Sequence, residues 1–219
     1  PSRHYFIDRP AQDSMAEQIR VFMGRRFDCA QCHDHPFEIW SQDQFWGLTA
    51  FFGRIVEIGK YGAGLFADLP GGHGDRGKGG DIIHPRNKKV VIPAYLDGHA
   101  LPGEKHEDPR RYLADWVTGH PFFSEAIVNR VWSNFFGRGI VDPIDDFGTS
   151  NPPSHQELFD ELARDFVENG HDIKHLIRRI VSSRTYQLSG RPNETNRHDR
   201  VNYSHAINRP LDAEVLLDA

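Results

Sequence analysis

Residues 29–33 read Cys29-Ala30-Gln31-Cys32-His33, and these two cysteines are the only ones in the 219-residue chain. Two cysteines three positions apart lie on one side of a helical turn, where their sulfurs can form thioether bonds to the two vinyl groups of a haem. A histidine directly after them can turn under the ring and bind the iron. The pattern predicts one covalent haem c, with Cys29 and Cys32 as thioether positions and His33 as the proximal ligand.

Three other uses of such a cysteine pair stay open, although we weigh haem above all of them together. A thioredoxin-like redox motif needs a βαβ setting, whereas the residues before Cys29 have helical spacing. A structural zinc site takes four ligands, and Cys29, Cys32, His33 and His35 would supply them in a crowded arrangement. A disulfide across two intervening residues closes so small a loop that it stabilises the chain little.

Composition sets the outer limits on function. A chain of 219 residues is long enough for one large domain or two small ones. Its formal net charge is −5, which leaves no overall basic footprint and disfavours a nucleic-acid partner. No run approaches about eighteen consecutive apolar residues, so we expect no membrane span in this stretch.

The residues on either side of the motif predict helices. Apolar residues recur at helical spacing over residues 13–26 and again over residues 41–55. Ser41 followed by Gln44 makes a capping box at the start of the second segment. The haem motif is therefore expected in a connection between two helices.

The turn after the motif carries another histidine. Pro36 disfavours helical geometry at His35 and holds that residue on a rigid turn beside the haem edge. His35 is thus a candidate for contacting a haem propionate, for binding a second metal with Asp34, or for ligating a neighbouring haem.

The second axial position of the iron has no evident ligand. Electron-transfer haems normally use a second Met or His there, whereas enzymes keep the position open. Met23, His73 and His84 are weak candidates. Core packing is the usual fate of a buried methionine such as Met23. His73 and His84 lie in or beside a long loop, where histidines are usually solvated.

The middle of the chain separates two predicted modules. Residues 59–80 are rich in glycine but lack a phosphate-binding GxxxxGK[ST] pattern, which indicates a long loop. Residues 88–93 predict a short strand that ends in proline, typical of an edge or a small hairpin. The polar run 99–108 marks the boundary, which gives a haem-binding module at 1–98 and a partner module at 99–219.

The partner module predicts an array of helices. Pro109 and Pro121 suit first helical positions. A capping box at residues 154–157 and an N-cap at Asp172 start two further helices. The predicted fold class is mainly α, with a small helical haem module, a helical array and one minor hairpin or strand region.

Two parts of the chain carry a family resemblance. Residues 25–54, with CAQCHDHPF and FWGLTAFFGR, resemble the second planctomycete cytochrome C-type domain family, whose members are large secreted bacterial proteins of unknown function. The chain from residue 108 onward resembles the domain that habitually follows it. The motifs of this second part are NRVWSNFFGRGIVDPIDDFGTSNPPSHQELFDELA, HLIRRIVSSRTYQLS and NRPLDAE.

The resemblance implies a location more than a reaction. Such proteins are associated with the breakdown of complex polysaccharides and with redox chemistry. Haem c is attached outside the cytoplasmic membrane, so we expect a periplasmic or secreted protein. Because the sequence starts without methionine or signal peptide and stops inside a helical pattern, we expect it to be part of a longer exported protein.

These observations lead to two hypotheses about function. In the first, the chain is an exported c-type haem protein that transfers electrons or oxidises a carbohydrate-derived substrate, with a redox partner protein or another haem domain. In the second, the helical array is a non-catalytic binding or assembly module and the haem is structural. The residues do not decide whether the protein is an enzyme.

Overall fold

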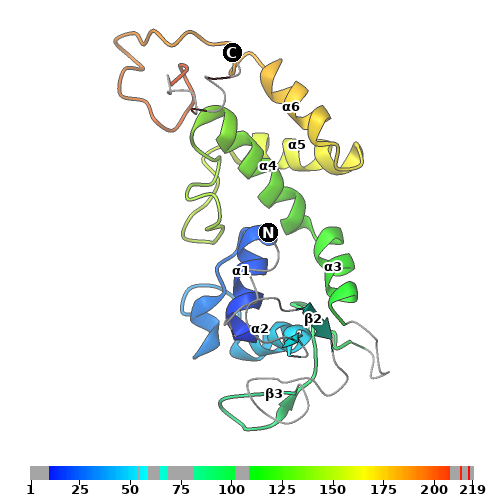
Figure 1. The fold of residues 1–219 in the computed structure, drawn as a ribbon. Helices are drawn as coiled ribbons and strands as arrows, with labels where there is room; N and C mark the ends of the chain where they lie inside the picture. The colour runs from blue at the N-terminus through cyan, green and yellow to red at the C-terminus, as the bar shows by residue number, and fades with distance from the viewer. Residues whose placement is uncertain are drawn as a thin grey trace. The chain divides into compact units, whose positions relative to one another are not determined.

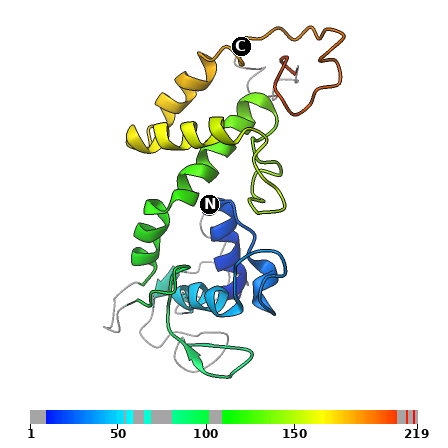
Figure 2. The ribbon, with the colours of Figure 1, turned by 180° about the vertical axis from the view of Figure 1, so that it is seen from behind.

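The structure is a computed structural model that describes residues 10–53, 55–58, 65–68, 81–101, 109–207, 213 and 217. Over these ranges the chain is mainly helical, as predicted (Figures 1 and 2). Two compact units are formed, the first by Pro1–Phe123 with Gly148–Ser150 and the second by Ser124–Phe147 with Asn151–Ala219. None of the described helices is both long and apolar enough to cross a membrane.

The first unit combines short helices with two small antiparallel sheets. Its elements are α1 (Ala11–Met23), the 3₁₀ helix η2 (Asp28–Gln31), α2 (Gln42–Thr49), the 3₁₀ helix η3 (Ala50–Phe52), β1 (Ile55–Ile58), β2 (Leu65–Asp68), β3 (Ile82–Ile83), β4 (Val90–Val91) and α3 (Pro109–Gly119). Strand β1 pairs with β2, and β3 pairs with β4.

Helix α1 delivers the chain to the cysteine motif. It ends earlier than predicted because Gly24 adopts a left-handed conformation (φ 65°) and its N–H donates to the carbonyl of Arg20. Met15, Ile19 and Met23 lie on its buried side. The chain therefore leaves α1 at Gly24 and turns into η2 with Phe27 fully buried between them.

Helix α2 begins where the sequence predicts and ends sooner. The capping box is confirmed, since the Ser41 side chain accepts from the N–H of Gln44 and the Gln44 side chain accepts from the N–H of Ser41. The prediction of helix as far as residue 55 is wrong, because the last turn tightens into η3 and Ile55 starts a strand.

The two small sheets differ in part from the sequence-based prediction for residues 55–93. Strand β2 falls inside the predicted glycine-rich loop 59–80, and the rest of that loop lies outside the described residues. The predicted strand near residues 88–93 is present as β4, in a hairpin with β3. The sequence pattern missed β1 and β2, whose pairing joins Ile55 to Asp68 across the chain.

The core of the first unit extends past the predicted module boundary. Its buried members include Phe27 of the motif region, Phe45 and Phe51 from α2 and η3, and Leu113 and Val117 from α3. Helix α3 therefore packs within the first unit. A compact unit and a sequence module are different divisions of the chain, and the boundary at 98/99 stays a prediction.

The second unit is a helical array, with α4 (Pro121–Phe136), α5 (Gln156–Glu168) and α6 (Ile173–Val181). Gly137 ends α4 with a φ of 77° and an N–H that donates to Ser133. Asp172 caps α6 as predicted, accepting from the N–H groups of Lys174 and His175 at 2.7 and 3.2 Å. Hydrogen bonding to the backbone lowers the pKa of Asp172.

The capping box predicted at residues 154–157 is wrong. His155 is the N-cap of α5, and its side chain makes no capping hydrogen bond. The Ser154 hydroxyl instead donates to the carbonyl of Ile140 at 3.0 Å. The local sequence pattern predicted that the Ser154 hydroxyl would cap α5. In the structure it donates to the loop after α4 instead.

A buried amide organises that loop. Asn129 on α4 is fully buried, and its Nδ2 donates to the carbonyl of Val141 at 2.8 Å while its Oδ1 accepts from the N–H of Val141 at 3.0 Å. A Cβ at Gly139 would lie 2.3 Å from the Val141 carbonyl and 2.8 Å from the Asn129 amide. Only glycine fits there, so helix and loop lock together through one side chain.

We expect Asn129→Ala to lower the free energy of unfolding by about 2–4 kcal/mol, because it leaves two buried backbone groups without partners. Urea denaturation followed by circular dichroism measures this loss. Asn169→Ala, which removes an exposed amide at the end of α5, is the control and should cost well under half as much. Equal losses for the two variants would contradict the assigned role of Asn129.

Candidate functional site

The two cysteines share one side of a tight turn. Cys29 lies in η2 and Cys32 is its C-cap. Positions three residues apart lie on the same face of a 3₁₀ helix, so Cys29 and Cys32 occupy one face of this turn. Both are free and exposed, whereas Ala30 between them is fully buried. The turn is anchored through Ala30 and presents its sulfurs outward.

Helix α2 fixes the backbone between the cysteines. The carbonyl of Gln31 accepts two side-chain hydrogen bonds, from Gln42 Nε2 at 2.9 Å and from Trp46 Nε1 at 3.1 Å. Gln42 is 2% exposed and Trp46 is 9% exposed, so both bonds are well shielded. Two donors on one carbonyl restrict the backbone at Gln31, and this restriction maintains the spacing between Cys29 and Cys32.

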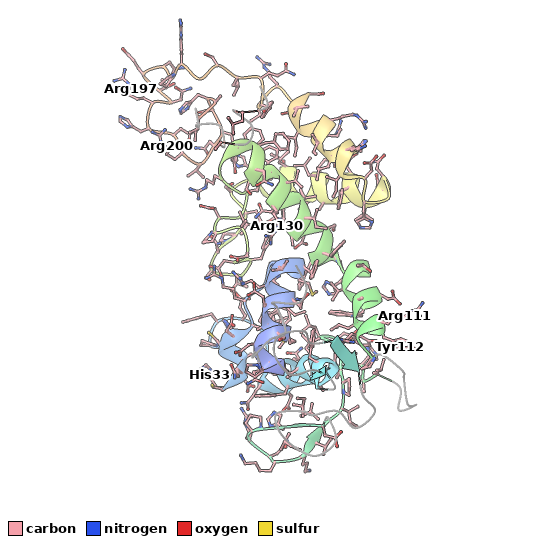
Figure 3. All side chains as sticks on the ribbon, viewed as in Figure 1. His33, Arg111, Tyr112, Arg130, Arg197 and Arg200 are labelled. Carbon is pink, nitrogen blue, oxygen red and sulfur yellow. The ribbon has the colours of Figure 1, made fainter. Side chains whose placement is uncertain are left out.

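One ring nitrogen of His33 is engaged by the backbone, which leaves the other for a ligand role. His33 is exposed at the surface of the first unit (Figure 3), and its Nδ1 lies 2.7 Å from the carbonyl oxygen of Asp34. A carbonyl only accepts, so Nδ1 carries the proton and the lone pair is on Nε2. Histidines that bind metals typically donate their other ring N–H to such a group.

His35 closes the turn that follows the motif. The Nδ1 of the His35 ring accepts from the backbone N–H groups of Glu38 and Phe37 at 3.0 and 3.3 Å. The backbone N–H of His35 donates to the carbonyl of Trp40 at 2.7 Å. The neutral ring therefore carries its proton on Nε2. That donor would suit a propionate, and the propionate contact stays a prediction.

The same turn holds a segment from far along the sequence. Glu38 Oε1 accepts from the N–H and the hydroxyl of Thr149 at 2.6 and 2.9 Å. A Cβ at Gly148 would lie 2.7 Å from that carboxylate oxygen. Sequence reasoning missed this contact because 111 residues separate its partners. In the sequence, the contact is marked only by Gly148 standing directly before Thr149.

The candidates for the second axial ligand are buried or lie outside the described residues. Met23 is 1% exposed and packs in the same core as Phe27. His84 is 3% exposed, its Nδ1 accepts from the N–H of Arg86, and its Nε2 lies 3.0 Å from Asp43 Oδ1 without hydrogen-bond alignment. His73 lies outside the described residues. Neither Met23 nor His84 presents a ligand atom at the surface, so the ligand stays unassigned.

The zinc alternative gains no support from the folded motif. In the described ranges, no three His, Cys, Asp or Glu side chains gather closely enough to hold a metal ion. That statement covers Cys29, Cys32, His33 and His35, which are all described.

Two large apolar side chains close to the motif in sequence are exposed to solvent. Phe37 is 79% exposed and Ile39 is 81% exposed, both in the turn that follows His33. Exposed apolar surface next to reactive groups is typical of a binding site. Paired thiols, a histidine with a free Nε2 and neighbouring apolar side chains together fit a covalently bound porphyrin.

Comparison with protein families supplies the classification. Residues 109–219, just over half of the chain, match the family model PSD1, described as Protein of unknown function (DUF1553). The chain belongs to this family. Residues 3–57, which include the cysteine motif, match PSCyt2, described as Protein of unknown function (DUF1549). The two matches occur in the order of the predicted domain pair. Searches of curated proteins and of solved structures gave no match.

We expect Trp46→Phe to destabilise the chain by about 1 kcal/mol, because it removes a donor to the Gln31 carbonyl and keeps an aromatic ring. The double variant Gln42→Ala/Trp46→Phe should lose more free energy of unfolding than the two single variants together. Its Gln31 carbonyl then has neither side-chain donor. Chemical denaturation measures both. Trp40→Phe, an equal change in size at a similarly buried ring, is the control. Strict additivity would show that the two bonds act independently.

Proposed function

We propose that the chain is part of an exported c-type haem protein with a redox role. Cys29 and Cys32 form the thioether bonds, and His33 binds the iron through Nε2. The observation that carries the proposal is the 2.7 Å hydrogen bond from His33 Nδ1 to the Asp34 carbonyl, which leaves Nε2 free beside two thiols on one side of a turn. A plain disulfide or a surface turn would require no such tautomer.

A haem bound there would supply one-electron redox chemistry, and the chain's own residues would position it. Gln42 and Trp46 hold the backbone between the thiols. The Asp34 carbonyl orients the His33 ring and increases its basicity as a ligand. His35 keeps the following turn closed, which maintains the positions of Phe37 and Ile39.

A redox role agrees with the first unit better than a structural haem does. A structural haem would fill a core that is incomplete without it. The first unit instead buries a continuous set of apolar side chains, including Phe27, Phe45 and Phe51, away from the exposed thiols. An exposed attachment site also gives a partner close access to the haem edge, and electron transfer needs such access.

The proposal extends to the location, partner and substrate of the protein. Haem c is attached outside the cytoplasmic membrane, so we place the protein in the periplasm or among secreted proteins. Its partner would be a redox protein or another haem domain. A carbohydrate-derived substrate is the proposal that the family resemblance supports.

We expect production with a cytochrome c maturation system to give a red protein whose mass is increased by one haem. Ascorbate- or dithionite-reduced samples should show sharp α and β bands. Cys29→Ser and Cys32→Ser should each remove one covalent link, the double variant should lose covalent haem, and His33→Ala should bind haem in an altered spin state. His99→Ala, which changes an exposed histidine outside the motif, is the control and should match the parent protein.

A colourless protein under these conditions, or the same haem content after Cys29→Ser/Cys32→Ser, would refute the proposal. A haem that attaches but resists reduction would favour the structural alternative. Carbon monoxide binding to the reduced protein would indicate an open axial position and hence an enzyme.

A further inference from the structure

A hollow of about 410 Å³ lies in the second unit, between α4, α5, α6 and the segment after α6. Its size falls within the range of about 300–1,000 Å³ that is common for small-molecule sites. The ten residues that line it are Trp132, Leu158, Leu162, His175, Arg178, Arg179, Ile180, Ser182, Ser183 and Thr185.

The lining has the opposite charge character from the chain. The whole chain has 31 acidic and 26 basic residues, yet the hollow is lined by two arginines and a histidine and by no carboxylate. Cations near the end of α6 suit the helix dipole, which accounts for Arg178 and Arg179 in part. The dipole does not explain why α5, which carries five carboxylates, contributes only Leu158 and Leu162 to the lining.

Two carboxylates outside the lining, those of Asp165 and Asp172, interact with these cations. Asp165 accepts from His175 Nε2 at 2.9 Å and lies 3.6 Å from Arg179 Nε. Arg178 forms no ion pair within 4 Å of a described residue, but its charge helps to lower the pKa of Asp172, the N-cap of α6. The guanidinium N–H groups of Arg178 therefore stay available to a ligand in the hollow.

Hydroxyl groups surround these cations. Ser183 Oγ accepts from the N–H of Tyr186, which leaves its hydroxyl proton available. The hydroxyls of Ser182 and Thr185 form no hydrogen bond to other described residues. Guanidinium and hydroxyl donors facing one space form a binding set for an oxyanion.

The opposite wall is aliphatic. Leu158 is 37% exposed, and Leu162 and Ile180 continue the wall into the buried core. Trp132, the aromatic member, is 2% exposed and offers almost no ring face for stacking. The wall thus suits an alkyl group better than the stacked ring of a sugar.

We propose that this hollow binds a small organic oxyanion, with its charged group at Arg178 and the neighbouring hydroxyls and its alkyl part against Leu158 and Leu162. The site is independent of the haem proposal, because every residue in it belongs to the second unit.

Isothermal titration calorimetry of the full chain at fixed ionic strength tests the site with four probes. Hexanoate and hexyl sulfate carry both the oxyanion and the alkyl group, acetate lacks most of the alkyl group, and hexanol lacks the charge. We expect measurable binding of at least one of the first two and weaker binding of acetate and hexanol. Comparison of hexanoate with hexyl sulfate identifies which oxyanion is preferred.

Arg178→Gln should weaken binding of the preferred probe roughly tenfold, the usual loss for one charge-assisted contact. Lys174→Gln, the same change of charge on the same helix outside the hollow, should leave affinity within about twofold. Unchanged binding by Arg178→Gln, equal losses in both variants, or hexanol binding as tightly as hexanoate would overturn the proposal. Circular dichroism of each variant excludes unfolding as the cause.

Discussion

Two hydrogen bonds to one carbonyl, that of Gln31, hold the turn that carries both cysteines of this chain. Their donors are Gln42 and Trp46, and both are side chains of α2. Helix α2 is itself started by the Ser41 capping box and packed through Phe45 and Leu48. A turn of four residues has too few contacts of its own to stay in one conformation, so the spacing of the two thiols depends on this neighbouring helix.

Asp34 links that support to the histidine. Its backbone carbonyl accepts from His33 Nδ1, and its side chain accepts from the N–H of Gln42 at the start of α2. Arg86 also lies 3.9 Å from the Asp34 carboxylate. The ring of His33 is therefore oriented by a residue that α2 holds in place. The same helix thus supports both the turn that carries the two thiols and the histidine that follows them.

The second unit follows a different design. A fully buried amide, Asn129, ties α4 to the loop that follows it. The remaining helices then enclose a hollow with donors on one wall and aliphatic groups on the other. The two family matches cover these parts separately, since one contains the cysteine motif and the other contains the helical array.

The sequence by itself determined the features that depend on near neighbours. Helix starts at Ser41, Pro109 and Asp172 were predictable because a cap satisfies backbone groups within three residues. The cysteine spacing is likewise a local property. Ser154 shows the limit of this reasoning, because the Ile140 carbonyl, 14 residues away, took the hydroxyl that a local cap would have used.

Only the tertiary structure decided which groups meet across the chain. The two donors on Gln31, the contact between Glu38 and Thr149 and the lining of the hollow all depend on how separate elements pack. Sequence periodicity reports which face of a helix is buried, but it does not report what lies opposite that face. A functional site needs both facts, because its chemistry depends on distances between residues that are remote in the sequence.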